Sequence, residues 1–162
     1  MSTLMSEDVE KRRRLTKIIA QVSRLGNYTL GRAFEREGLP ISREQWDVLV
    51  MLWDKDGRAQ QEFATFLLKN RASITSLVDN MEKNNLVTRV PNPNDKRSKL
   101  IYLTRKARDL KEQVVGIAED AILSITKGIP LEEVEQAADL LTKCLENIME
   151  YDESILEEQK GE

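Results

Sequence analysis

Apolar side chains recur every three or four residues along most of the chain, which is the period of helices with one buried face. The first such stretch predicts a long helix over residues 8–37, ended by a Gly-Leu-Pro sequence. Ser42 and Gln45 stand three residues apart, as in a capping box, and predict the start of a second, shorter helix. The chain therefore begins with a long amphipathic helix followed by a compact helical segment.

Two further helices are predicted over residues 59–68 and 70–83, the latter with Asn70 as its N-cap. The second of these has an apolar face and a distinctly polar one. The polar face carries Arg71, Ser73, Thr75, Ser76 and Asn80. The helix over residues 70–83 is expected to end at Asn84-Asn85, where Asn85 can adopt the left-handed conformation usually given to glycine.

The period then changes to that of strands over residues 87–90 and 100–103. The intervening residues 91–99 are rich in Pro, Asn, Asp and basic side chains, which predicts a hairpin with an overlong tip. Most hairpin loops need about two to five residues, so a longer tip favours a function for it.

The C-terminal part returns to helical spacing. Thr104 is expected to cap a long helix that reaches Ile125, and a Gly-Ile-Pro sequence separates it from a last helix. In that last helix residues 134–155 form a heptad-like apolar seam. The seam predicts either packing against a second copy of the chain or a helical hairpin within one chain.

The composition excludes most catalytic chemistry. The 162 residues contain no histidine and a single cysteine, Cys144, so histidine-dependent catalysis and zinc sites lack their usual groups. We expect no enzyme activity, no cofactor and no metal site, and a buried thiol at Cys144 because it lies on an apolar stripe. No apolar run approaches a membrane span and the first residues are polar, so a cytoplasmic protein is expected.

The charge is unevenly distributed, although the whole chain carries only −3. Residues 69–108 hold ten basic and three acidic residues, a local charge of +7, whereas residues 109–162 hold four basic and fifteen acidic residues, a local charge of −11. The basic block coincides with the polar-faced helix and the hairpin. Charge alone is equally consistent with a phosphate-binding surface and with a solvated polar face.

Two motifs in this block resemble the MarR family of bacterial transcriptional regulators. Residues 74–87 (ITSLVDNMEKNNLV) are similar to the family's TxLVDxLExxGLV helix, and residues 89–100 (RVPNPNDKRSKL) to its RxPxxxDxR wing, followed by the closing Leu103-Thr104. The resemblance implies a mainly α fold with a small β-hairpin wing. It implies a winged helix-turn-helix DNA-binding domain over residues 38–103, and a helical dimerisation region formed by residues 1–37 and 104–162.

The resemblance also implies roles for individual residues. The recognition helix over residues 70–83 is expected to enter the major groove, and Arg97 of the wing the minor groove. Asp95 is expected either to orient an arginine in the wing or simply to cap the turn, and Lys96 and Lys99 to contact phosphates. The candidate DNA-binding residues are Asn70, Arg71, Ser73, Thr75, Ser76, Asn80, Asp95, Lys96, Arg97 and Lys99.

The expected partners are double-stranded DNA, a second copy of the chain, and a small aromatic or anionic effector. The homodimer would be a ligand-responsive repressor on a pseudo-palindromic operator. Candidate effector contacts are Arg24, Tyr28, Trp46 and Trp53, although the helical spacing of the two tryptophans is more typical of core packing.

One alternative remains open at this point, a winged-helix protein–protein adaptor that does not read a DNA sequence. It is favoured by the acidic total and by Ser76, since many members of the family have arginine there.

Overall fold

The computed structural model describes residues 7–151, except for the side chains of Lys96 and Arg97. The elements are α1 (Glu7–Arg36), α2 (Arg43–Asp54), β1 (Arg58–Ala59), α3 (Gln60–Phe66), α4 (Arg71–Lys83), β2 (Val87–Asn92), β3 (Asp95–Leu103), α5 (Arg105–Asp109), α6 (Lys111–Ile125) and α7 (Leu131–Tyr151). The predicted fold class is confirmed: the chain is mainly helical, with one small antiparallel sheet in the order β1-β3-β2.

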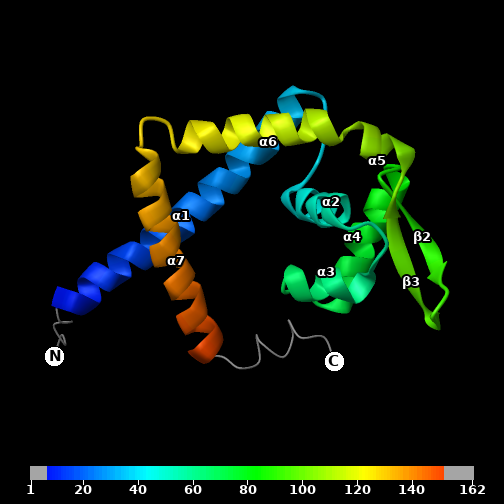
Figure 1. Cartoon of the computed structure of the whole chain (residues 1–162), viewed down its shortest axis with the longest axis horizontal. Coiled ribbons are helices and arrows are strands. Elements are labelled where there is room, and N and C mark those ends of the chain that lie inside the picture. The colour runs from blue at the N-terminus through cyan, green and yellow to red at the C-terminus, as the bar shows by residue number, and fades with distance from the viewer. Residues whose placement is uncertain (1–6, 152–162) are drawn as a thin grey trace.

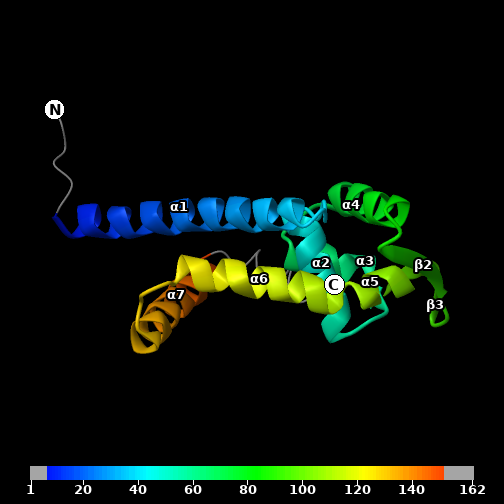
Figure 2. The same cartoon turned by 90° about the horizontal axis from the view of Figure 1, so that it is seen from above.

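The elements form a compact lobe at one end of two long helices. Helices α1 and α6 pack against each other and diverge away from the lobe in Figure 1, and α2 to α5 with the sheet gather at their right-hand end in Figures 1 and 2. The core fills this lobe and extends to the near ends of α1 and α6. Its fully buried large side chains are Phe34, Val48, Leu49, Leu52, Phe63, Ile74, Val78, Met81, Ile101 and Val114.

The predicted helix caps are present. Ser42 accepts a hydrogen bond from the backbone of Gln45, whose side chain accepts one from the backbone of Ser42. Asn70 caps α4 and Thr104 caps α5. At the end of α4 the backbone of Asn85 has φ +55°, the predicted left-handed conformation. These features follow from local sequence, because the hydrogen bonds at each helix end join residues that are only a few positions apart.

The wing differs from the prediction of an overlong loop. Strands β2 and β3 extend past the predicted ends until Asn92 pairs with Asp95, and a register shift after Pro91 absorbs the additional residues of β3. The side chain of Asn92 explains this order, because it accepts a hydrogen bond from the backbone of Asn94 and donates one to the hydroxyl of Ser98. Polar side chains therefore stabilise the tip from within.

Two further differences concern element boundaries. The predicted helix from Thr104 to Ile125 is divided at Leu110 into α5 and α6. Strand β1, which was not predicted, pairs Arg58 with Ile101 and Ala59 with Leu100. A two-residue strand has no detectable period of its own, and it fastens the start of α3 to the base of the wing.

The turn before β1 is held by Asp56. Its carboxylate accepts hydrogen bonds from the backbone N–H groups of Gly57 and Leu103 and from the guanidinium of Arg108, so that it joins α2, β3 and α5. Gly57 has φ +75°, and a Cβ atom there would lie 2.6 Å from the ring of Tyr102. This position therefore requires glycine for two reasons.

We expect Gly57→Ala to lower the free energy of unfolding by about 2–4 kcal/mol, the sum of left-handed strain and a steric clash. Gly38→Ala is the matched control, because Gly38 has φ +71° with open space around it and incurs only the strain. Urea denaturation of both variants measures the difference. Equal losses would contradict the close approach of Tyr102.

The long helices leave apolar surface uncovered. No residue of α7 is buried, and Leu140, Leu141, Leu145 and Ile148 of its seam are all at least 38% exposed. Cys144, expected to be buried, is only partly covered in a single chain. The predicted seam ends at Ile155, which lies outside the described residues. Over residues 7–151, no helix has the length and apolar character needed to cross a membrane.

Candidate nucleic-acid interface

The polar face of α4 is exposed next to the wing. Arg71, Ser73 and Ser76 are exposed on this helix, and its first turn contains no acidic residue. The amide groups at a helix N-terminus carry partial positive charge, and a cation placed there favours an approaching anion. The geometry therefore presents an electropositive helix start to solvent.

Two of the predicted DNA contacts have structural roles within this helix start. Asn70 uses its side-chain oxygen to cap α4, accepting from the backbone N–H of Ser73 at 2.9 Å. The hydroxyl of Thr75 donates to the carbonyl of Arg71 and accepts from the side-chain amide of Gln60 at 2.8 Å. Thr75 thus connects α4 to α3, and its only hydroxyl proton is used inside the protein.

Asn80 lies farther along α4 and is joined to α2. Its side-chain oxygen accepts hydrogen bonds from the amide of Gln45 at 2.7 Å and from the amide of Asn84 at 3.1 Å. Gln45 is 5% exposed, and it is the one buried polar side chain found in the described part of the chain. The contact fixes α4 relative to the start of α2.

We expect Asn80→Ala to lower the free energy of unfolding by about 1–3 kcal/mol, because the buried amide of Gln45 loses its acceptor. Ser73→Ala, on the exposed face of the same helix, is expected to change stability by less than about 0.5 kcal/mol. Thermal or urea unfolding compares the two. An unchanged stability in Asn80→Ala combined with loss of discrimination at a single base pair would instead assign Asn80 to base contact.

Arg89 fastens the wing to α4, a role not predicted from sequence. Its guanidinium lies 2.6 Å from the carboxylate of Asp79, also pairs with Glu82, and donates to the carbonyl of Thr75. The backbone N–H of Arg89 donates to Glu82 as well. Two of the three acidic residues of the basic block are therefore used to hold one arginine.

Other cations of the basic block are also paired. Lys69 lies 3.3 Å from Glu44, and the ammonium of Lys106 donates to the carbonyl of Asn84. The pKa of the Glu44 carboxyl is lowered by a backbone hydrogen bond at the start of α2 and by Lys69. Arg71 and Lys99, both exposed, form no ion pair with any described residue and contribute positive charge to this surface.

The wing presents its remaining candidates on β3. Asp95 and Lys99 are exposed there, and the backbone carbonyl of Asp95 accepts from the hydroxyl of Ser98. The backbone of Lys96 and Arg97 lies between them, and their side chains are outside the described part of the structure. Their DNA contacts remain predictions from sequence.

The four candidate effector contacts are divided between core and surface. The ring of Trp46 packs against Phe34 and Trp53 at centroid distances of 5.6 and 6.0 Å, and the indole of Trp53 donates to the carbonyl of Ala107. Arg24 and Tyr28 are exposed on α1. The partly buried tryptophans therefore join α1, α2 and α5 at the edge of the core.

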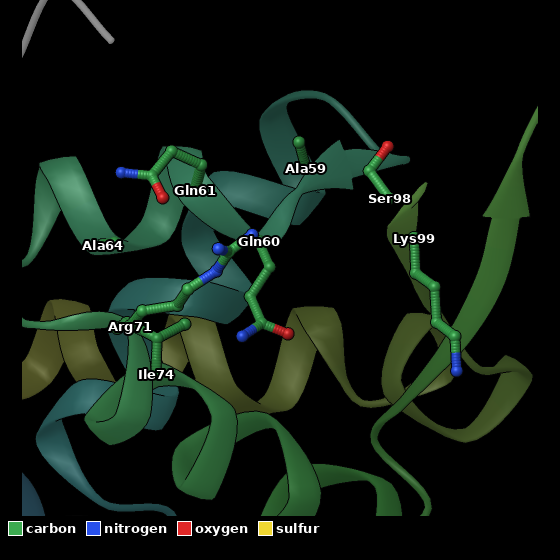
Figure 3. Close-up of a pocket in the computed structure, with 8 residues that line it drawn as sticks. All are labelled: Ala59, Gln60, Gln61, Ala64, Arg71, Ile74, Ser98 and Lys99. Carbon is green, nitrogen blue, oxygen red and sulfur yellow. The ribbon is translucent and has the colours of Figure 1, made fainter. Parts of the chain in front are cut away.

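Gln60 and Gln61 were missed by the sequence reasoning. They stand at the start of α3 and, together with Arg71 and Lys99, line a cavity between α3, α4 and the wing (Figure 3). A pair of glutamines after a turn carries no signal of its own. Only the unpredicted strand β1 brings them beside the wing.

Comparison with known proteins gives one consistent result. Residues 41–99 match the model of the MarR family. The chain is 28% identical over 149 residues to the transcriptional activatory protein BadR of Rhodopseudomonas palustris, an alignment that covers 90% of this chain and 84% of that protein.

Solved structures agree with this similarity. A mutant of MarR from E. coli complexed with operator DNA is 26% identical, with a TM-score of 0.76 over 86% of this chain and 99% of that one. A SlyA-like transcription regulator from Listeria monocytogenes is also 26% identical, with a TM-score of 0.75 over 90% of this chain and 93% of that one.

Proposed function

Since this chain is a MarR-type transcriptional regulator, we propose that it binds a pseudo-palindromic DNA operator as a homodimer and represses transcription until a small ligand releases it. The observation that carries the proposal is the exposed, acid-free start of α4 beside the wing, with Arg71 and Lys99 unpaired among the described residues. The similarity to a MarR mutant in complex with operator DNA supports the same use of this surface.

The docking follows from the shape of the lobe. Helix α4 enters the major groove, whose width of about 12 Å admits a helix, and Ser73 and Ser76 face the base edges. The wing reaches the adjacent minor groove, where Arg97 meets the negative potential of an A·T-rich sequence. Arg71 and Lys99 contact phosphates, which provide affinity without sequence information.

The homodimer is supported by the uncovered apolar surface. In addition to the α7 seam, α1 exposes Ile18, Val22 and Leu25. Apolar surface of this extent on several helices is expected to be buried against another molecule. A twofold dimer places the two recognition helices about 34–36 Å apart, one turn of DNA.

The ligand is proposed to bind at the long helix α1. The exposed Arg24 and Tyr28 on α1 supply a cation and an aromatic ring for an anionic or aromatic effector. The packed Trp46 and Trp53 provide a fluorescence signal for binding, because they join the long helices to the DNA-binding lobe.

A gel-shift titration with DNA from upstream of the protein's own gene tests sequence-specific binding. We expect a complex with two chains per duplex that is displaced by unlabelled specific DNA and not by equal amounts of random duplex. Equal competition by both duplexes would contradict sequence reading. No shifted complex, together with a protein partner whose binding is insensitive to salt, would favour the adaptor function.

A reporter gene fused to the same upstream DNA tests the direction of control. Expression is expected to rise when the gene for this chain is deleted. A fall would show activation, the role named for BadR.

A further inference from the structure

A cavity of about 260 Å³ lies where α3, α4 and the wing meet (Figure 3). Four elements contribute to it: the end of β1, helix α3, the start of α4 and the part of β3 that follows the wing tip. The lining residues are Ala59, Gln60, Gln61, Ala64, Arg71, Ile74, Ser98 and Lys99. We call this space the α3–wing cavity.

The charge of the α3–wing cavity is entirely positive. Arg71 reaches into it from α4 towards the glutamines, and Lys99 lies on the opposite side with Ser98 (Figure 3). None of the lining residues is acidic, and neither cation has an ion-pair partner within the described ranges. Arg89, close by in the same lobe, is by contrast held by two carboxylates. The arrangement favours an anion between the two cations.

The polar lining is fixed by internal hydrogen bonds. The amide of Gln60 is tied to Thr75 at 2.8 Å, and the hydroxyl of Ser98 accepts from Asn92 at 2.9 Å. Gln61 is exposed, and its side-chain amide can turn its N–H donors towards a bound anion. The guanidinium of Arg71 reaches into the cavity, whereas the side chain of Lys99 points away from it in Figure 3 and would turn towards a bound anion. Guanidinium, ammonium and amide donors suit the oxygens of a phosphate group.

We propose that the α3–wing cavity holds one backbone phosphate of the DNA, shared by Arg71 of the recognition helix, Gln61 of α3 and Lys99 of the wing. This inference rests on the proposed function. The sugar–phosphate strand separates the major groove from the adjacent minor groove. A protein that places α4 in one groove and its wing in the other must therefore straddle that strand, and the cavity lies between these two elements.

A phosphate that is shared by α4 and the wing couples the positions of these two elements on the DNA. The wing and α4 are positioned on the DNA together, since a shift of either one away from the strand weakens the same contact. Gln61 then acts as a DNA-binding residue without contacting any base, and its contribution is the same on every sequence.

The salt dependence of DNA binding by the full-length dimer tests whether Arg71 and Lys99 contact the same phosphate. The variants are Arg71→Ala, Lys99→Ala and the double variant, with Lys127→Ala in the α6–α7 loop as the control for loss of one charge. If the two cations share one phosphate, the double variant lowers the log–log salt slope by about 0.9 per subunit. Separate phosphates would lower it by about 1.8 per subunit, which would overturn the proposal.

The contribution of the glutamine is tested separately. Gln61→Ala is expected to weaken binding to specific and random duplexes alike by about tenfold, without changing the salt slope, because it removes a neutral donor to a charged acceptor. Gln136→Ala on α7 is the matched control and is expected to leave affinity unchanged. A loss confined to one duplex sequence would assign Gln61 to base contact and contradict the phosphate site.

The same measurements separate this inference from the proposed function. If the wild-type chain binds no DNA at 50 mM salt, both fail. If the wild-type chain binds DNA but the double variant keeps the full salt slope, only the phosphate site fails. Titration with inorganic phosphate at constant ionic strength completes the test, since tight phosphate binding that is lost in the double variant, with an unchanged DNA slope, would assign the cavity to a free oxyanion.

Discussion

Leu145→Arg is expected to convert the proposed dimer to monomers and to weaken operator binding at least 100-fold. Leu145 lies on the apolar seam of α7 and is 56% exposed in a single chain. A charge buried in an apolar interface without a partner is strongly unfavourable, so the two chains separate. Each half-site then binds alone, and the gain from linking two recognition helices is lost.

The control for this variant is Asn147→Arg, which adds the same charge to α7 two residues away, off the apolar seam. Sedimentation equilibrium gives the mass of both variants, and fluorescence anisotropy gives their DNA affinity. We expect Asn147→Arg to remain dimeric and to bind DNA normally. A monomeric Leu145→Arg that keeps full operator affinity would contradict the dependence of DNA binding on dimerisation.

The second large effect is expected for Arg89→Ala, which releases the wing from α4. The side chain of Arg89 is 15% exposed, and its guanidinium pairs with Asp79 and Glu82. Its removal leaves two neighbouring carboxylates without their cation, and the expected loss of stability is about 2 kcal/mol after allowance for the solvent exposure of Asp79. DNA affinity is expected to fall by about 10- to 100-fold on all duplexes, because wing and recognition helix no longer share a fixed geometry.

Arg89→Lys separates geometry from charge in this contact. Lysine keeps the positive charge but cannot donate in parallel to two carboxylates and to the Thr75 carbonyl. We therefore expect intermediate affinity and stability, measured by anisotropy and urea unfolding. If Arg89→Lys and Arg89→Ala weaken DNA binding equally while stability is unchanged in both, Arg89 contacts DNA rather than positioning the wing.

The features predicted correctly are those that depend on neighbours in sequence. The capping box at Ser42 and the left-handed Asn85 were both identified because their hydrogen bonds close within a few residues. Strand β1 was not identified, since Arg58 and Ala59 become a strand only through pairing with Ile101 and Leu100. The order of the wing tip likewise depends on side-chain contacts of Asn92 that no hydrophobic period reveals.

In the candidate site, too, the features that depend on contacts between distant residues were not predicted. The polar face of α4 was predicted, but sequence could not show that two of its exposed residues, Thr75 and Asn80, form hydrogen bonds to α3 and α2. Nor could a count of charges show that Arg89 is neutralised by Asp79 and Glu82, whereas Arg71 is not. The basic block is therefore a smaller and more localised surface than its net charge of +7 suggests.

The salt dependence of DNA affinity measures the central claim, that the helix α4 and the wing form the DNA-binding surface of a dimeric regulator. Each chain offers one phosphate contact shared by Arg71 and Lys99 and, from sequence, contacts by Lys96 and Arg97, giving about six contacts in a dimer and a log–log slope of about −5. Anisotropy titrations with the upstream DNA at 50 and 200 mM salt are thus expected to differ by about 10³-fold in affinity. An affinity that stays constant between these salt concentrations would contradict the account.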